Sequence, residues 1–546
     1  MNHRNRGLVR LALIVLVALL VSTAAACQRA EPPKPAPAAP APTVPTPPQP
    51  KPGGTLVLAV GGNPVSLDPA LMRDWISRQA IINMYDSLVD LNEKEEVVPS
   101  LAKSWRVEEG GLRYVFELRD DVLFHDGTRF NAEAVKFNYD RMLDPAFNSR
   151  NLATLSPVIA RVEVLGEFTV AFNLKRIDVD FLTEMSWSGL MVSPTAARLH
   201  GVDFARNPVG TGPFAFKAFE PDSHLDLVRN DKYWRGAPLV DGIRVRIIPE
   251  ASTRNVELEA GNLHISYHAS AKDRERLKRA GLVVEERTTA SFQMLSFNLA
   301  DGPTAELAVR NAIARAIDRD IIIQQVLHGA AQKSRAGVPS TSPYYHADVP
   351  MIEYNTKEAE RILDQAGWVK GADGIRRKGG ELLKIKLVTS DAEERVLISQ
   401  IIQEQLNLVG FSVEIVTLEW GAYLDAMRAG NYHISYWSLG GTALRSSNGT
   451  ANMKSDAHWN VSQIRRQPAL ADVSARIDVI VDTASQTVDD QTRFNMLKEF
   501  QMLSYEHQLI FWLWHVQSHH VFQPYVKDYI LYNYNIIWTY DVWLDR

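Results

Sequence analysis

Strand-like and helical runs alternate along most of this chain, and that alternation restricts the folds it can adopt. LDLVRN, IRVRIIP, LKIKLVTS and FSVEIVTLEW read as strands, whereas AELAVRNAIARAID and RVLISQIIQEQLNLVG carry apolar residues at helical spacing. The pattern is typical of α/β proteins with mixed sheets, and we see no internal repeat and no coiled-coil heptads. A chain of 546 residues also exceeds what one hydrophobic core usually organises, so we expect at least two lobes.

The composition is that of an ordinary globular protein. Hydrophobic residues make up 46% and charged residues 23% of the chain, and 59 basic against 64 acidic side chains leave a formal net charge of -5. This balance creates no positive field that would gather phosphates. We therefore expect no nucleic-acid partner.

The N-terminus has the pattern of an export signal. Arg4, Arg6 and Arg10 precede an apolar run from residue 11 to residue 21, and the small residues STAAA follow. The run is shorter than the ~20 apolar residues of a spanning helix, and no later run is long enough. We predict a signal peptide over residues 1–26 and an exported mature protein.

The only cysteine, Cys27, directly follows this segment, so no intrachain disulfide can form. It resembles the lipobox cysteine of bacterial lipoproteins, and we expect it to carry a lipid anchor. Ala24 stands where those boxes usually have leucine, and AAA also fits ordinary signal cleavage, so a secreted protein without an anchor is the alternative. The proline- and alanine-rich residues 27–52 would form an extended tether of roughly 3 Å per residue.

The stretch ELRDDVLFHDGTRFNAEAVKFNYDRM, residues 117–142, gathers acids, a histidine and a glycine, residue types that also occur in catalytic and metal centres. Its local signals are structural. Asp126-Gly127 predicts a tight turn that carries His125, and Asn131 is a good N-cap for the helix that follows. That helix would have Glu133 in its first turn and one face made by Val135, Asn138, Tyr139 and Met142. No nucleophile and no third, orienting group stands near His125 and Asp126. We therefore expect no catalytic His-Asp site.

Two further segments have a clear period. Residues 79–89, QAIINMYDSLV, carry apolar residues at helical spacing, which predicts a helix. Tyr114, Phe116 and Leu118 alternate with polar residues, which predicts a half-buried strand.

Other motifs with chemical meaning are weak. GTGP at residues 210–213 lacks a phosphate-loop pattern and reads as a turn into a strand. His515 and His519 have the spacing of a helical metal pair, but their neighbours LIFWLW and VF read as strand and no third ligand accompanies them. We expect no metal site. Two carboxylates that are distant in the sequence can meet in a cleft, as in a glycosidase, and no spacing in this sequence selects such a pair.

Several segments carry a resemblance to a known family. NPVGTGPFAFKAFEPDSHLDLVRNDKYWRGAPLVDGIRV, residues 207–245, resembles the signature of the family 5 extracellular solute-binding proteins, the dipeptide, oligopeptide and nickel receptors of ABC importers. The same resemblance covers YDSLVDLNEKEEVVPSLAKSWRV, DGTRFNAEAVKFNYDRM, SFNLADGPTAELAVRNAIARAIDRD and KEAERILDQAGW. These segments lie in the family's order from about Gly53 to near the C-terminus.

The resemblance implies a type II periplasmic-binding-protein fold, the Venus-flytrap arrangement of two α/β lobes that close around a ligand. Two crossover segments would join the lobes near Asn298 and Trp512. We expect lobe one at 53–298 with an extra subdomain at about 85–200, lobe two at 299–510, and a return to lobe one at 511–546. Residues 117–142 would belong to the extra subdomain, as scaffold.

The resemblance also nominates ligand-binding residues. In the family, a lobe-two segment with a tryptophan and, three residues later, an aspartate faces the ligand. Here the segment reads ISYWSLGGTALR, in which Trp437 matches the tryptophan, Tyr436 and Ser438 flank it, and Gly440 stands at the aspartate position. Further candidates are Arg73 and Trp75 in a lobe-one loop, Ser291 before the crossover strand, and Arg150 and Trp187 in the extra subdomain.

The function implied is an extracytoplasmic substrate-binding receptor of an ABC importer, with no catalytic residue and no cofactor. Its partners would be a small organic ligand, the permease subunits, and a membrane contacted through the lipid at Cys27. We expect a monomer in the periplasm or on the outer face of the cell membrane. The alternative is a secreted hydrolase that acts on a saccharide or peptide through a carboxylate pair, and turnover would distinguish it.

Gly440 is a departure from the peptide-binding members of the family, whose aspartate pairs with the α-ammonium group of the peptide. A buried ammonium without a charged partner is costly. We therefore expect unmodified peptides to bind poorly and the ligand to be a different or larger organic molecule, such as a modified peptide, a sugar conjugate or a metal chelate. The alternative is that another carboxylate, such as Asp425 or Asp456, replaces the missing one.

Overall fold

An 11-stranded mixed sheet runs through the computed structural model, which describes residues 49–72, 75–267, 271–439, 453–457, 460, 462–531 and 538–546. Its strands follow the order β18-β17-β19-β12-β20-β11-β1-β10-β9-β8, and β13 pairs with β20 off this path. Their bounds are β18 Ser412–Leu418, β17 Lys384–Ser390, β19 Ile434–Leu439, β12 Val283–Phe297, β20 Ile510–Phe522, β11 Ile265–Tyr267, β1 Thr55–Val60, β10 Gly242–Ile247, β9 His224–Arg229, β8 Phe214–Glu220 and β13 Ala331–Lys333.

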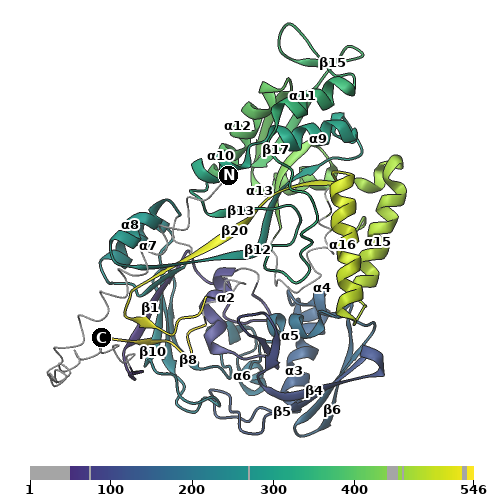
Figure 1. Ribbon diagram of the computed structural model, residues 1–546. Coiled ribbons are helices and arrows are strands. Elements are labelled where there is room, and N and C mark those ends of the chain that lie inside the picture. Colours follow the sequence, from purple (N-terminus) through teal and green to yellow (C-terminus); the bar gives the residue numbers. More distant parts are fainter. Residues whose placement is uncertain are drawn as a thin grey trace, which may run out of the picture. The chain divides into compact units, whose positions relative to one another are not determined.

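The two long strands β12 and β20 connect the two halves of this sheet (Figure 1). The C-terminal end of β20 pairs with β11, and its middle, residues 514–516, pairs with β13. β12 follows β20 along most of its length but pairs with β19 only from Phe292 onward. The pairing of β12 with β20 is irregular between Thr288 and Phe292. These antiparallel strands run between the two halves of the two-lobe α/β fold that the sequence predicted. The predicted positions of the lobe boundaries stay a prediction.

Lobe one is built on β1, which pairs in parallel with β10 and β11. Successive side chains of β1 point to opposite faces of the sheet, so they pack into two different hydrophobic clusters. Leu56, Leu58 and Val60 join one hydrophobic cluster. Ala59 joins another, which also contains Leu258 of α7 (Ala251–Glu259) and Leu277 of α8 (Arg274–Arg279).

Lobe two is built on β17, which pairs in parallel with β18 and β19. Its core gathers apolar side chains from these strands, from the nearby ends of β12 and β20, and from the surrounding helices. The helices of this part of the chain are α9 Leu307–Ala316, α10 Arg319–Gln325, α11 Thr356–Gln365, α12 Glu393–Leu408, α13 Trp420–Ala429, α15 Ala471–Ala484 and α16 Asp490–Glu506.

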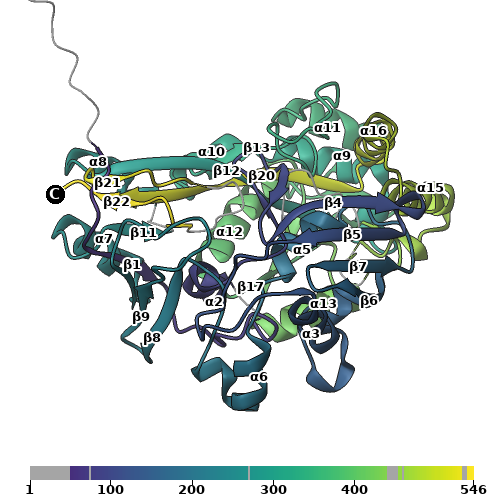
Figure 2. The same ribbon diagram turned by 90° about the horizontal axis from the view of Figure 1, so that it is seen from below.

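A separate antiparallel sheet of four strands, in the order β4-β5-β7-β6, lies within the range predicted for the extra subdomain (Figure 2). Its strands are β4 Ala102–Glu108, β5 Arg113–Leu118, β6 Ile159–Gly166 and β7 Thr169–Leu174. The helix α3 (Ala132–Leu143) packs on it, and the ring centroids of Tyr139 and Phe172 lie 4.7 Å apart. No helix in the described parts of the chain has the length and apolarity that crossing a bilayer requires.

Residues 117–142 form the turn and helix that the sequence predicted. The Asn131 side chain accepts a hydrogen bond from the Ala134 N–H at 3.0 Å and caps α3, whose buried face includes the predicted residues. Asp126 accepts hydrogen bonds from the Thr128 N–H at 3.0 Å and from the Ser193 hydroxyl at 2.5 Å. His125 lies against the GTGP turn, with its Nε2 3.0 Å from the carbonyl oxygen of Gly212. The histidine and the aspartate therefore hold the backbone in place.

The helix predicted over 79–89 is wrong in its boundaries. Helix α2 covers Trp75–Ile81, a 3₁₀ turn covers Ile82–Met84, and the short strand β2 begins at Val89. The reason is that backbone groups here bond outside any helix: the Met84 carbonyl oxygen accepts from the Gly212 N–H at 3.0 Å, and the Asp86 N–H donates to the Thr211 hydroxyl at 3.2 Å. A backbone segment held by such distant partners cannot follow the local helical period.

Candidate functional site

Arg395 organises a cluster of aromatic side chains where β17 and β19 end. It lies in the first turn of α12, which follows β17. Its Nη1 donates to the carbonyl oxygen of Tyr436 at 3.0 Å, and its Nη2 donates to the Ser438 hydroxyl at 2.6 Å. The guanidinium carbon is 5.2, 5.7 and 5.8 Å from the ring centroids of Tyr436, Trp420 and Tyr423. Ligands of α/β proteins bind at this carboxyl edge of parallel strands.

Tyr436 and Trp437 point to opposite faces of β19, because successive side chains of a strand alternate. Trp437 is 3% exposed and its ring centroid lies 5.7 Å from that of Tyr423. Tyr436 is 2% exposed and lies 6.1 Å from the ring centroid of Trp514. In this structure the Trp437 ring packs into the hydrophobic core of lobe two, next to Tyr423. Its contact with a ligand stays a prediction.

A pocket with a volume of about 480 Å³ opens beside Tyr436, and we call it the crossover pocket because β12 and β20 line it. This volume is within the range of small-molecule sites, about 300–1,000 Å³. Gln293 pairs across the sheet with Ser438 and Trp514, which places all three on the pocket's face of the sheet. The lining residues are Ala271, Lys272, Gln293, Val326, Leu327, His328, Ala330, Glu393, Glu394, Leu397, Tyr436, Trp514, Val516, Gln517 and His519.

Carboxylates, amides and histidines are among the polar groups of the crossover pocket. Burial raises the pKa of the Glu394 carboxyl, and the positive charge of Arg395 lowers it in part. Burial lowers the pKa of His519, which keeps its imidazole neutral at pH 7. Within the described residues, the amide oxygen of Gln293 and the Nε2 of His519 are buried and have no hydrogen-bond partner.

Ser291 and His515 lie at the irregular pairing of the crossover strands. Ser291 is half-buried, and its N–H donates to the Thr289 hydroxyl at 3.2 Å. His515 faces Ser334, with 3.1 Å between its Nε2 and the serine hydroxyl, and burial lowers its pKa to about 4. His515 and His519 stand on strand β20, not on a helix. Among the residues that the structure describes, no group of three or more His, Cys, Asp or Glu side chains is arranged to hold a metal.

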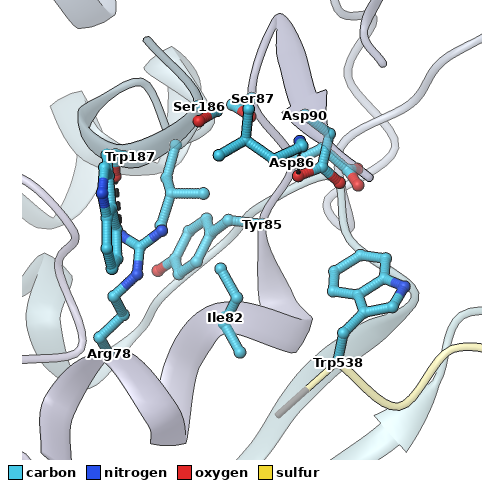
Figure 3. Close-up of a pocket in the computed structure, with 11 residues that line it drawn as sticks. Arg78, Ile82, Tyr85, Asp86, Ser87, Asp90, Ser186, Trp187 and Trp538 are labelled. Atoms are coloured by element: carbon cyan, nitrogen blue, oxygen red, sulfur yellow. Dashed lines mark hydrogen bonds between the residues drawn. The ribbon is translucent and has the colours of Figure 1, made fainter. Parts of the chain in front are cut away.

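Trp187 lies in lobe one beside Arg78 of α2 (Figure 3). The Arg78 guanidinium stacks 3.8 Å above the Trp187 ring, and its Nη1 donates to the Trp187 carbonyl oxygen at 2.7 Å. Both residues line a cavity of about 30 Å³, which has room for water but not for an organic ligand. Asp86 and Asp90 line it too, and burial raises the pKa of both carboxyls, that of Asp86 to about 6.

The remaining predicted residues are spread over the chain. Arg150 is exposed, and its N–H donates to the carbonyl oxygen of Ala70 at 3.1 Å, close in sequence to the predicted lobe-one loop. Arg73, Gly440 and Cys27 lie outside the described residues, as does the side chain of Trp75. The structure thus brings Tyr436 and Ser438 together around one cation, and it places Trp187 elsewhere, in the wall of the small lobe-one cavity.

Sequence reasoning missed Arg395, Glu394 and Gln293. The first two were accessible, since EERVL begins only three residues after the strand LKIKLVTS ends, and polar residues at such a strand end are candidates for ligand contact. The two carboxylates considered as replacements for the missing aspartate are engaged on the surface. Asp425 pairs with Arg428 at 2.6 Å, and Asp456 lies 3.9 Å from Lys454.

Comparisons with known proteins agree with one another. The sequence pattern of the bacterial extracellular solute-binding proteins, family 5 Middle, matches residues 96–461. The chain is 28% identical to the oligopeptide-binding protein AppA of Bacillus subtilis (strain 168), over 80% of this chain and 82% of that protein. It is also 28% identical to the nickel-binding periplasmic protein of Escherichia coli (strain K12), over 74% and 79% of the two chains. The structure of NikA from Brucella suis in complex with Fe(III)-EDTA superposes with a TM-score of 0.83 at 27% identity, covering 90% of this chain and 100% of that one.

Proposed function

Because the chain belongs to the family 5 bacterial extracellular solute-binding proteins, we propose that it captures an organic solute at the carboxyl edge of lobe two. It is a substrate-binding receptor that works with the permease of an ABC importer, rather than a hydrolase. The single observation that carries the proposed site is the Arg395 cluster, which fixes Tyr436 and Ser438 next to an open pocket.

The ligand would bind through aromatic surface and a few fixed polar groups. Arg395 and Ser438 supply hydrogen-bond donors at the end of β19. The ring centroid of Tyr436 lies 5.2 Å from the guanidinium carbon of Arg395. Aromatic walls with a small number of oriented polar groups are typical of sites for organic ligands. Trp437, Ser291, Arg73, Trp75, Gly440, Arg150 and Trp187 remain further candidates for contact after lobe closure.

Closure of the lobes would signal the bound state to the permease. Only a ligand that binds the closed form more tightly than the open form can drive that closure. The crossover strands β12 and β20 are the segments that would bend, since they connect the two halves of the sheet. We place the division between the lobes at residues 298 and 510, with the extra subdomain at about 85–200.

The relatives differ in what their names say they bind. They include an oligopeptide-binding protein, dipeptide-binding proteins, a nickel-binding protein and a heme-binding protein. A fold that serves such different solutes does not fix the ligand of this chain. We propose an organic solute, either peptide-like or of another class.

We further propose export through a signal peptide at residues 1–26 and a lipid anchor at Cys27, with residues 27–52 as the tether. The apolar run, the small residues before the sole cysteine and the proline-rich composition support this arrangement. The receptor would then act as a monomer at the outer face of the membrane or in the periplasm.

Binding at the Arg395 cluster is tested by tryptophan fluorescence. The protein is purified without denaturation, its bound solute is released by unfolding, and the refolded protein is titrated with that solute. We expect a saturable change in fluorescence with one solute per chain. Absence of any saturable change, or chemical conversion of the solute during the titration, would contradict the proposed receptor function.

A further inference from the structure

Two acidic side chains at the rim of the crossover pocket, Glu393 and Glu394, make no ion pair with any described residue. Glu393 and Glu394 lie in the first turn of α12, and both residues are exposed, although the surrounding protein desolvates the Glu394 carboxyl enough to raise its pKa. Among the described residues neither takes part in an ion pair or a side-chain hydrogen bond. The adjacent Arg395 directs its guanidinium to Tyr436 and Ser438 instead. The carboxylates are thus available to a ligand.

The floor of the pocket also has unused polar atoms. The amide oxygen of Gln293 is buried without a hydrogen-bond partner in the described parts of the chain, and so is the Nε2 of His519, a side chain only 4% exposed. Leaving buried polar atoms unpaired costs free energy, so native proteins usually pair them with water or a ligand. Both atoms belong to residues that line this one pocket.

The charges around the pocket favour a cation over an anion. Glu393 and Glu394 are the acidic groups that line it, and Lys272 and His328 are exposed basic residues at its rim. The remaining titratable lining groups, His519 and Tyr436, are uncharged at pH 7, because burial lowers the pKa of the histidine and raises that of the tyrosine. An anion would meet the two carboxylates directly, whereas the guanidinium of Arg395, which partly offsets the charge of Glu394, is already bound to Tyr436 and Ser438.

Aromatic side chains complete the lining. Trp514 is 1% exposed and Tyr436 is 2% exposed, and their ring centroids lie 6.1 Å apart. The negative face of an aromatic ring attracts cations, and an ammonium or guanidinium group also has the N–H donors that Gln293 and Glu394 can accept. A neutral group would gain little from the carboxylate and the aromatic rings, and an anion would be repelled by the carboxylate.

We propose that the crossover pocket holds a positively charged, hydrogen-bond-donating group of the ligand, an ammonium or guanidinium, between Glu394, Gln293 and the rings of Tyr436 and Trp514. This inference rests on the proposed receptor function and names the chemical class of its solute. It also supplies the carboxylate that the sequence lacks at Gly440. Glu394 takes this role, whereas Asp425 and Asp456 lie in surface ion pairs.

The test uses two probes that differ in charge but hardly in shape, butylguanidinium and butylurea. Binding of each to the solute-free protein is measured at pH 7.5 by saturation-transfer NMR. We expect butylguanidinium to bind at least about tenfold more tightly, because hydrogen bonds to charged groups are the stronger ones. Glu394→Gln should abolish most of that preference. Glu404→Gln, an exposed glutamate of the same helix that does not line the pocket, should retain it.

Equal binding of the two probes, or an unchanged preference in Glu394→Gln, would overturn the proposal. The solute recovered from the native protein separates this failure from a failure of the receptor function. A solute without a cationic group, bound equally by wild type and Glu394→Gln, would end the present inference and leave the receptor intact. Turnover of the solute would contradict the receptor function itself.

Discussion

The carboxylate of Asp86 accepts a hydrogen bond from the hydroxyl of Tyr233 at 2.8 Å, across 147 positions of the sequence. The same carboxylate accepts hydrogen bonds from the Thr211 hydroxyl at 2.9 Å and from the Trp234 indole N–H at 3.3 Å. Asp86 therefore ties together the YDSLV, GTGP and DKYW segments through which the chain resembles its family. The hydrogen bonds of Asp86 thus hold three distant segments of lobe one together.

The first prediction concerns the protonation of Asp86. Burial raises the pKa of its carboxyl from 3.8 to about 6, so the folded state binds the proton more tightly than the unfolded state. Its contribution to the free energy of unfolding is fully present below pH 4 and is lost as the pH rises to about 6. A pKa shift of this size corresponds to a change of about 3 kcal/mol in the free energy of unfolding.

Urea unfolding of wild type and Asp86→Asn between pH 4 and pH 7 measures this contribution. We expect the stability difference between the two proteins to change with pH over that window, because asparagine does not titrate. Asp472→Asn, on an exposed position, serves as the control and should run parallel to wild type. Parallel curves for Asp86→Asn would refute the assignment.

The second prediction concerns the close approach of the GTGP turn to residues 84 and 85. A Cβ on Gly212 would lie 2.5 Å from the carbonyl carbon of Met84 and from the N atom of Tyr85, and one on Gly210 would overlap the same segment. We expect Gly212→Ala to lower the free energy of unfolding by about 3 kcal/mol or more. Gly166→Ala is the matched control, since its Cβ would meet only Thr169 at 3.9 Å. Similar midpoints of urea denaturation for the two variants would contradict this account.

These two features also show what sequence could and could not predict. The turn at Asp126-Gly127 and the cap at Asn131 depend on neighbours within three residues, so local patterns predicted them correctly. The predicted helix over 79–89 fails where the Asp86 N–H donates to the Thr211 hydroxyl, 125 positions away, and local patterns do not reveal such a contact.

The candidate site divides in the same way. The resemblance nominated Tyr436 and Ser438, which the structure places together. Arg395 enters the cluster only because two parallel strands end at one edge, and its partner Ser438 is 43 positions away. Side-chain pairing at that distance leaves no periodic signal in a single sequence.

The third prediction tests the geometry of Arg395. Lysine keeps the positive charge but cannot donate to Tyr436 and Ser438 from one planar group. We expect Arg395→Lys to weaken solute binding by roughly tenfold, as seen by calorimetry, while the urea midpoint stays close to that of wild type. Arg428→Lys, at an exposed ion pair with Asp425, should bind as wild type. Full affinity in Arg395→Lys would remove this residue from the site.

The fourth prediction concerns the anchor at Cys27. If its thiol is acylated, the exported protein should partition into the detergent phase and carry the added mass of a diacylglycerol. Cys27→Ser should release it into the aqueous phase with unchanged solute affinity, since the proposed tether would keep the anchor away from the solute site. A mature protein with a free Cys27 thiol would refute the anchor.

The central claim is that this chain binds a solute and leaves it intact. The most direct measurement is mass spectrometry of the protein purified under native conditions, followed by unfolding and identification of what is released. The account predicts one organic molecule per chain, recovered unchanged after incubation with fresh protein and bound less tightly by Arg395→Lys. Recovery of cleaved or otherwise converted products, accumulating with time beyond one per chain, would contradict it.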